Sequence, residues 1–146
     1  MRELPLPDIP GDVPAEGLTI GQAAAVLGLP AETIRYYDRA GLMLDPTPRN
    51  SAGQRRYQQP DLDWIGGLVM LRDTGMSIAD IRAVAAISRR PGTEAERLAV
   101  FESHRQRVLD DLARIHRHLD AIDRKIDTYR AVVQERNPTH ADQTAR

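Results

Sequence analysis

The chain has 146 residues, of which 41% are hydrophobic and 28% charged, with a formal net charge of −1 and no cysteine. This length suits one ordinary domain, or a small domain with an extended element, and no apolar run is long enough to cross a bilayer. The lack of cysteine excludes disulfides, thiolate zinc sites and iron–sulfur clusters. The near-neutral charge conceals a local excess of arginine, since residues 35–57 hold five arginines and two aspartates.

Both ends of the chain are predicted to lack a fixed fold. Residues 1–17 contain four prolines and four acidic residues without sustained periodicity, which is typical of a flexible leader. They also lack the apolar stretch of a secretory signal, so we expect a cytoplasmic protein. Residues 136–146 are too few to fold alone and are expected to form a disordered tail.

The first part of a predicted domain, residues 18–90, has the pattern of a helix-turn-helix. Thr19 and Gln22 form a capping box, which predicts a first helix over residues 20–27. A second helix is predicted over residues 31–39, after a turn at Gly28. The motif needs a small residue in the first helix, a glycine in the turn and an aliphatic residue in the second helix. The residues in these three roles are Ala24, Gly28 and Ile34.

The second helix carries two adjacent tyrosines that must face opposite ways. Ile34 and Tyr37 are three residues apart and share one face of the helix. Thr33 and Tyr36 share another face. We therefore expect Tyr37 in the core and Tyr36 turned toward a partner.

The next segment predicts a small β-hairpin, or wing. Residues 42–44 and 54–57 can form strands, and the loop between them is rich in Pro, Asn, Ser and Gly. Side chains alternate along a strand, so Arg55 and Tyr57 share one side and Arg56 has the other. Arginine on a wing suits phosphate oxygens. A solvated, charged hairpin without a ligand is the alternative.

Two packing helices and a long heptad helix complete the predicted order. The packing helices begin at Pro60 and after Ser77, and Trp64 is expected to anchor the core or support the wing. Residues 94–135 repeat apolar side chains at spacings of three and four, which predicts a dimeric coiled coil; packing within one chain is the alternative. Its seam consists of Leu98, Phe101, Arg105, Val108, Leu112, Ile115, Leu119, Ile122, Ile126, Tyr129 and Val133, and His104, His116 and His118 are expected to face outward.

Three segments carry a resemblance to a known family. They read TIGQAAAVLGL, TIRYYDRAGLMLDPTPRNSAGQRRYQQPDL and LRDTGMSIADIRAV, and they precede the heptad helix. Over about residues 18–134 the chain resembles the mercury-resistance-regulator (MerR) family of bacterial transcription factors. The resemblance implies a mostly α fold, in which a winged helix-turn-helix domain is followed by an antiparallel dimeric coiled coil. It also implies a homodimer that distorts promoters with an over-long spacer, so that RNA polymerase can engage both promoter elements.

The resemblance also implies DNA-binding roles for individual residues. The second helix would enter the major groove, and the wing would touch the flanking backbone. Asp38 is expected to pair with Arg56 and fix the wing against the helix. Arg35 and Tyr36, with Thr33 on the same face, are expected to contact bases or phosphates. Arg39, Arg55 and Tyr57 are expected to contact the DNA backbone.

The sequence excludes some functions and leaves others open. Thiolate sensing is excluded, no metal, cofactor or large effector domain is expected, and a small-molecule or protein effector stays open. One alternative is an effector-independent repressor or architectural protein, and another is a coiled-coil scaffold whose head binds protein. An enzyme is not expected, because the sequence shows no carboxylate pair, nucleophile–base arrangement or phosphate-binding glycine loop.

Overall fold

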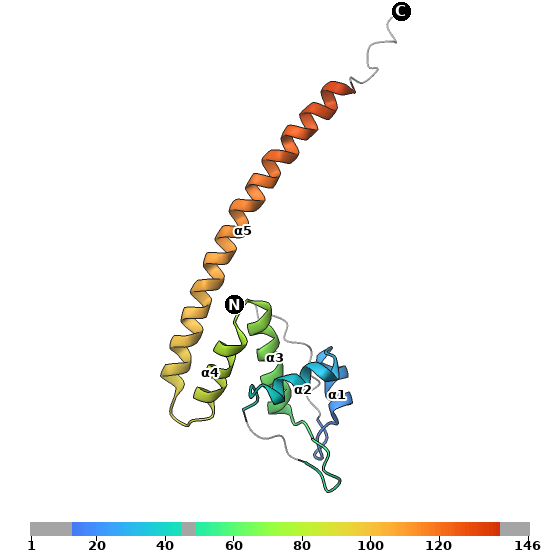
Figure 1. Ribbon diagram of the computed structural model, residues 1–146, viewed down its shortest axis with the longest axis vertical. Coiled ribbons are helices and arrows are strands. Elements are labelled where there is room, and N and C mark those ends of the chain that lie inside the picture. Colours follow the sequence, from blue (N-terminus) through green and yellow to red (C-terminus); the bar gives the residue numbers. More distant parts are fainter. Residues whose placement is uncertain (1–12, 45–48, 138–146) are drawn as a thin grey trace, which may run out of the picture. The chain divides into compact units, whose positions relative to one another are not determined.

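The computed structural model describes residues 13–44 and 49–137, so the predictions for most of the leader and nearly all of the tail lie outside the described residues. The described residues are mostly helical, as predicted. They form α1 (Ile20–Leu27), α2 (Ala31–Arg39), α3 (Gln59–Asp73), α4 (Ile78–Ser88) and α5 (Glu94–Arg136) (Figure 1). The chain divides into two compact units, and the division falls inside α5 between His104 and Arg105. The first unit is called the head below.

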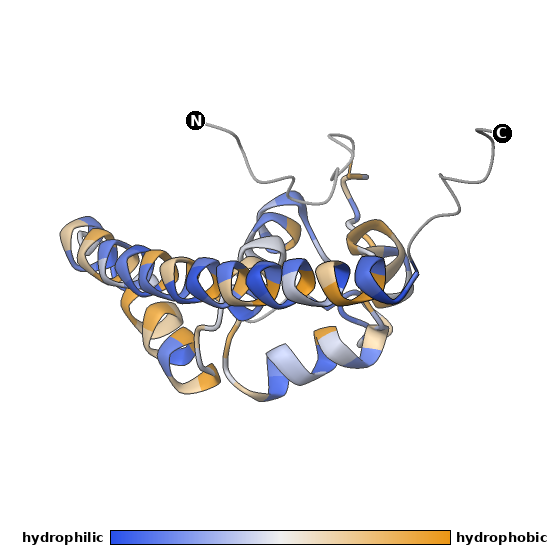
Figure 2. Cartoon of the chain, turned by 90° about the horizontal axis from the view of Figure 1, so that it is seen from above, coloured by the Kyte–Doolittle hydropathy of each residue, from blue (hydrophilic) through white to orange (hydrophobic). Residues whose placement is uncertain are grey.

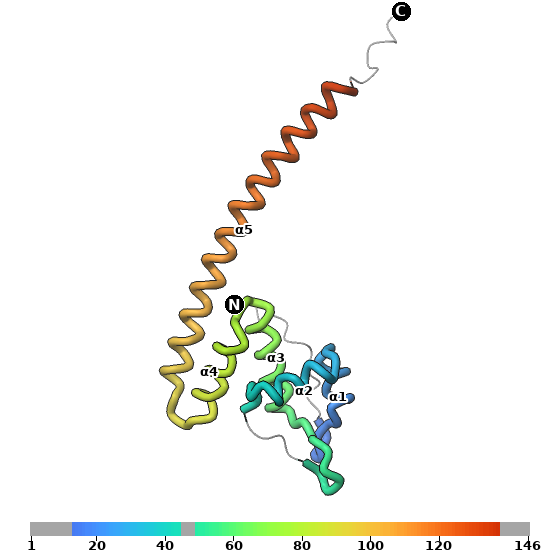
Figure 3. Tube along the Cα trace, in the orientation of Figure 1, coloured from blue at the N-terminus to red at the C-terminus, as the bar shows by residue number. Residues whose placement is uncertain are grey.

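The helix-turn-helix at the start of the head is confirmed. Thr19 Oγ1 accepts a hydrogen bond from the Gln22 amide at 3.2 Å, and Gln22 Oε1 accepts one from the Thr19 amide at 2.9 Å, so the capping box is complete. Gly28 has φ of 65°, a left-handed conformation that lets the chain turn sharply between α1 and α2 (Figure 3). Ile34 is fully buried in the core, where α1 and α2 pack against each other.

The core of the head lies where α1 packs on α2 and α3, and α4 packs on α3. Tyr37 is 6% exposed and joins this core, as predicted. Trp64 is half-buried against it, and its Nε1 donates to the Leu42 carbonyl oxygen at 2.7 Å. The leucine and isoleucine residues that are 0% exposed are Ile34, Leu42, Leu62, Ile65, Leu68 and Ile81. Removing these side chains from water stabilises the head.

The wing contains the second predicted strand segment, residues 54–57, but that segment pairs with other residues than the predicted 42–44. Leu42 and Met43 do not pair with residues 54–57. Both side chains are apolar and are buried in the core of the head. The wing, defined here as residues 49–57, is closed by an antiparallel bridge between Arg49 and Arg55. Its tip turns at Gly53, which has φ of 77°.

Tyr57 at the end of the wing pairs with a segment that precedes α1. The amides and carbonyl oxygens of Leu18 and Tyr57 exchange two hydrogen bonds, of 2.8 and 2.9 Å. The neighbouring Gly17 has φ of 75°, and a Cβ atom there would come within 2.8 Å of Gln58 Nε2. Glycine therefore permits the close approach that joins residues before α1 to the wing.

The first turns of α5 belong to the head. Thr93 is buried, and Val100 packs against the core. His104 is 6% exposed, and its Nε2 lies 2.8 Å from Thr74 Oγ1. The prediction that His104 faces outward is therefore wrong. The reason is that Val100 and His104, together with Thr93 just before α5, lie on a face that is offset by one residue from the heptad seam, and this face packs on the head.

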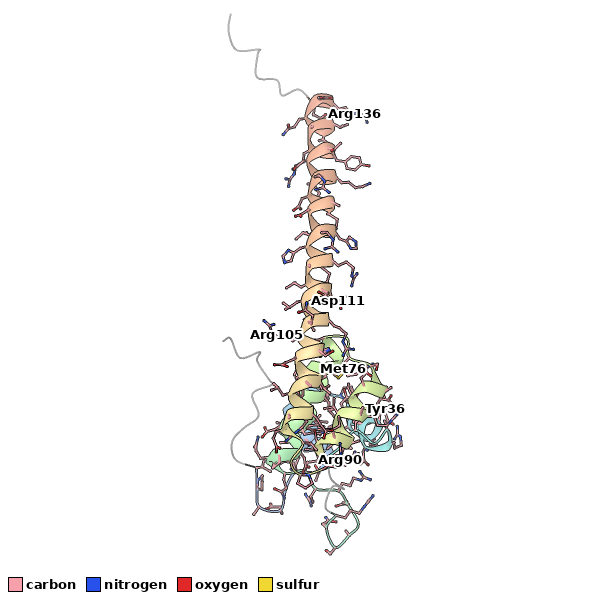
Figure 4. The ribbon with its side chains drawn as sticks, turned by 90° about the vertical axis from the view of Figure 1, so that its left-hand side faces the viewer. Tyr36, Met76, Arg90, Arg105, Asp111 and Arg136 are labelled. Carbon is pink, nitrogen blue, oxygen red and sulfur yellow. The ribbon has the colours of Figure 1, made fainter. Side chains whose placement is uncertain are left out.

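Beyond Arg105, α5 leaves its apolar seam uncovered. Figure 2 shows hydrophobic residues recurring along this helix between hydrophilic ones, and side chains project from it along its length (Figure 4). The large apolar residues of the seam are 40% to 67% exposed: Leu112, Ile115, Leu119, Ile122, Ile126, Tyr129 and Val133. Leu98 and Phe101 on the seam are also exposed, whereas Val108 is half-buried. Among the described helices, none combines the length and apolarity needed to cross a membrane.

Candidate nucleic-acid interface

A basic hollow lies between α2, the start of α1 and the wing. Its volume is about 400 Å³. Four arginines and one aspartate contribute to its lining, which leaves a net excess of three positive charges. Its lining residues are Thr19, Ile20, Arg35, Asp38, Arg39, Arg49, Gly53, Gln54, Arg55 and Tyr57. A concave surface with this charge attracts an anion such as a phosphate group.

The outward face of α2 borders this hollow. Tyr36 is 43% exposed, and its side chain lies at the surface of the head (Figure 4). Arg35 and Arg39 are also exposed, and Thr33 is half-buried. The structure thus brings the predicted residues of α2 onto one accessible side of the helix, opposite the buried Ile34.

Glu32 is a member of this surface that the sequence analysis missed. Its carboxylate oxygens lie 3.3 Å from Arg35 Nη1 and 2.9 Å from Arg39 Nη2. Hydrogen bonds from Arg39 and then Arg35 hold the pKa of Glu32 below its usual value. The spacings of three and seven residues place all three side chains on one face of α2, which was the available signal. The Glu32 carboxylate therefore engages both arginines on the surface of α2.

The predicted ion pair between α2 and the wing forms with a different arginine. Asp38 Oδ2 pairs with Arg55 Nη1, and the two side chains are 21% and 30% exposed. The predicted pair between Asp38 and Arg56 is therefore wrong. Arg55 and Tyr57 lie on the same side of the wing, as the alternation of side chains predicted. That side faces α2, whereas the prediction had turned it toward DNA.

Tyr57 is a core residue and not a surface contact. It is 1% exposed, and burial raises the pKa of its hydroxyl above the usual value. The prediction that Tyr57 contacts the DNA backbone is corrected by this burial. Aromatic residues in strands pack well on a half-buried surface, and here the inner side of the wing supplies that surface.

Nothing in the described part of the chain gathers ligands for a metal ion. Within residues 13–44 and 49–137, no three His, Cys, Asp or Glu side chains lie close enough together to hold one. The polar side chains that line the hollow are four guanidinium groups, the Asp38 carboxylate, the Gln54 amide and the Thr19 hydroxyl.

Comparison with known proteins agrees with this geometry. The sequence model described as MerR HTH family regulatory protein matches residues 18–86. An uncharacterized HTH-type transcriptional regulator of Haemophilus influenzae is 37% identical over 112 residues, which cover 76% of this chain and 82% of that protein.

Solved structures give the same result. The crystal structure of HiNmlR, a MerR family regulator lacking the sensor domain, bound to promoter DNA, is 36% identical with a TM-score of 0.70, and the match covers 77% of this chain and 90% of that one. A MerR family transcriptional regulator from Bacillus thuringiensis is 31% identical with a TM-score of 0.68, and the match covers 77% and 98% of the two chains. With its helix-turn-helix, wing and basic hollow, the chain belongs to the MerR family of DNA-binding transcription regulators, which are not enzymes.

Proposed function

We propose that the protein binds promoter DNA in a sequence-specific manner as a homodimer, with α2 in the major groove and the wing on the flanking backbone. The observation that carries this proposal is the hollow lined by four arginines beside the exposed face of α2. The size of an α-helix matches the major groove, where base edges differ between all four base pairs. The basic hollow would then receive a phosphate group of the adjacent backbone.

The side chains of α2 and of the wing divide into two roles under this proposal. Arg35 and Tyr36 project away from the core and would contact base edges or phosphates, with Thr33 beside them. Arg39 and Arg55 line the hollow and would contact phosphate oxygens, which suit the planar guanidinium fork. Phosphate contacts fix the register of the protein, and base contacts supply specificity.

The apolar seam of α5 supports the proposal of a homodimer. An exposed stripe of large hydrophobic side chains at heptad spacing needs a partner, and a second copy of the chain offers the same stripe. We propose that two α5 helices pair in an antiparallel coiled coil. Two heads linked in this way bind two half-sites more tightly than either head binds one.

The proposed effect on transcription is activation at promoters whose spacer is too long. Distortion of the spacer by the dimer would bring both promoter elements within reach of RNA polymerase. Transcription with purified RNA polymerase tests this step, with one promoter of over-long spacer and one of ordinary spacer. Activation of the first promoter alone supports the proposal, whereas repression of both supports a repressor or architectural role.

Binding measurements with matched variants test the DNA interface. The probe is a duplex that the wild-type protein enriches from a random pool. Arg35→Ala and Tyr36→Phe should each weaken binding by about 1–3 kcal/mol, the value of a good base contact. Arg114→Ala is the control, because Arg114 also pairs with an acidic residue three positions away on an exposed helix face. Full affinity in both α2 variants would contradict the assignment of α2 to the groove.

A further inference from the structure

The segment that follows α2 is held by side chains through its backbone carbonyl groups. Arg82 Nε donates to the Ala40 oxygen at 2.8 Å. Trp64 Nε1 donates to the Leu42 oxygen at 2.7 Å. Arg89 supplies the remaining donors, so that each carbonyl from Ala40 to Leu44 accepts a hydrogen bond from a side chain of α3 or α4, or from the C-cap of α4. These contacts are called the carbonyl clamp below.

Arg89 makes most of the carbonyl clamp. Its Nη2 donates to the Gly41 oxygen at 2.7 Å. Its Nε lies 3.1 Å from the Met43 oxygen and 3.0 Å from the Leu44 oxygen. A planar guanidinium can reach several acceptors at once in fixed directions, which a lysine ammonium on a flexible stem cannot do.

The position of the carbonyl clamp suits a cation. Ala40, the C-cap of α2, is the first residue whose carbonyl is held, and the helix dipole places partial negative charge at this end of α2. Arg82 lies within α4 and Arg89 is its C-cap seven residues later, so the two arginines lie on one side of this helix, two turns apart. Two arginines from one helix thus fix the end of another, α2, to which they are not adjacent in sequence.

The segment held in this way continues directly from the proposed recognition helix. Ala40 is the C-cap of α2, one residue after Arg39 and four after Tyr36. A rotation or tilt of α2 would displace the carbonyls of Ala40 and Gly41 from their donors. The carbonyl clamp therefore opposes those motions of α2.

We propose that Arg89 is a positioning residue for DNA recognition, which holds α2 in the orientation that presents Arg35 and Tyr36 to the groove. This inference rests on the proposed function, since it concerns the same DNA-binding surface. Arg89 acts through the backbone after α2, and its guanidinium is engaged with carbonyl oxygens and not with DNA. Its loss should reduce the discrimination between DNA sequences more than it reduces general affinity for DNA.

The experiment compares affinities for two duplexes of equal length, one enriched from a random pool by the wild-type protein and one of random sequence. Arg89→Gln removes both the positive charge and the planar guanidinium group. Arg89→Lys keeps the charge but lacks the planar set of N–H donors. Arg90→Gln is the matched control, because Arg90 is the next residue, is exposed and pairs with Glu96 at 2.8 Å. Arg82→Gln removes only the bond to Ala40 and serves as a milder variant.

The expected result is a loss confined to the enriched duplex. Arg89→Gln and Arg89→Lys should bind it about tenfold more weakly, which corresponds to about 1.4 kcal/mol. Their affinity for random DNA, and both affinities of Arg90→Gln, should stay within about twofold of wild type, as is usual for surface substitutions. Arg82→Gln should show a smaller loss of the same kind.

Three results would overturn the inference. Equal losses on both duplexes with rescue by Arg89→Lys would show that Arg89 contacts phosphate. Wild-type affinities in every Arg89 variant would show that the carbonyl clamp does not position α2. Loss of the fold in all the Arg89 and Arg82 variants, measured by circular dichroism, would show that it serves folding instead. Failure of the wild-type protein to enrich any sequence would contradict the proposed function itself, so the two failures are distinguishable.

Discussion

Adjacent residues on α2 meet opposite environments. The rings of Tyr36 and Tyr37 have centroids 6.1 Å apart, yet one tyrosine is 43% exposed and the other 6%. Helical spacing alone predicted this difference. The same spacing also places Glu32 beside Arg35 and Arg39, where its carboxylate holds the cations that we assign to DNA. Under the proposed function, a phosphate group would have to displace that carboxylate, so Glu32 would compete with DNA for the two arginines.

The first prediction concerns this competition. Glu32→Gln should tighten DNA binding and make it more sensitive to salt, because Arg35 and Arg39 become free to neutralise phosphates and release counterions. Affinity is measured at several salt concentrations. The control is Glu96→Gln, which removes the same charge from an exposed carboxylate paired with Arg90. Equal effects of the two substitutions would show that only net charge matters and would contradict the competition.

The second prediction follows from the burial of Tyr57. Its folded pKa lies above the usual value of 10.0, so the unfolded state loses the hydroxyl proton first as pH rises. The stabilising contribution is fully present below that value and is lost as pH increases through the folded pKa. Urea unfolding at about pH 8 and about pH 11 should therefore show a smaller loss of stability in Tyr57→Phe than in wild type. The control is Tyr36→Phe, which removes the hydroxyl of an exposed tyrosine outside the seam; identical pH dependence in Tyr57→Phe and wild type would contradict the prediction.

At the scale of elements, local signals predicted the helices better than they predicted the wing. The capping box at Thr19 and the left-handed turn at Gly28 are local, and both formed as the sequence indicated. Alternation along residues 54–57 correctly grouped Arg55 with Tyr57, but alternation cannot say which side meets the core. That choice depends on α2, which supplies Asp38 across the wing.

The start of α5 shows the same limit. The heptad pattern is continuous through residues 98–105, so the sequence gives no break where the helix leaves the head. His104 is nevertheless buried beside Thr74, which lies 30 residues away in sequence. The carbonyl clamp was also beyond prediction, because side-chain bonds from Arg82 and Arg89 to backbone carbonyls leave no mark in the hydrophobic pattern.

The third prediction tests how α2 and the wing are joined. Arg55→Ala removes a cation from the hollow and leaves the Asp38 carboxylate without its partner. That carboxylate should then repel phosphate, so Arg55→Ala should weaken DNA binding more than the double variant Asp38→Ala with Arg55→Ala does. A double-mutant cycle of DNA affinities measures the difference. Additive effects would show that the pair does not act as a unit in DNA binding.

At the scale of the whole molecule, the two units differ in whether their apolar side chains are buried. The head buries its own core, with residues such as Ile65 and Leu68 fully covered. The unit that begins at Arg105 exposes Leu112, Leu119 and Ile126 along its seam. This contrast is the basis for assigning self-association to α5 and DNA binding to the head.

The fourth prediction separates these two activities. Leu119→Asp should place a carboxylate in the seam of the proposed coiled coil, where burying an unpaired charge is costly, so the helices should separate. Sedimentation should show a smaller species, and tight DNA binding should be lost although no residue of the basic hollow has changed. Ala121→Asp is the control, because it adds the same charge two residues away, at a position outside the seam. Dimers of full affinity in Leu119→Asp would show that α5 is not the dimerisation element.

The proposed homodimer binds promoter DNA sequence-specifically with its two identical heads. Selection of duplexes from a random pool by the full-length wild-type protein tests this proposal most directly, because the enriched sequence records both specificity and symmetry. We predict an inverted repeat, with two half-sites at one fixed spacing. Enrichment of a single unrepeated half-site would contradict the dimer, and a pool that stays random would contradict sequence-specific binding.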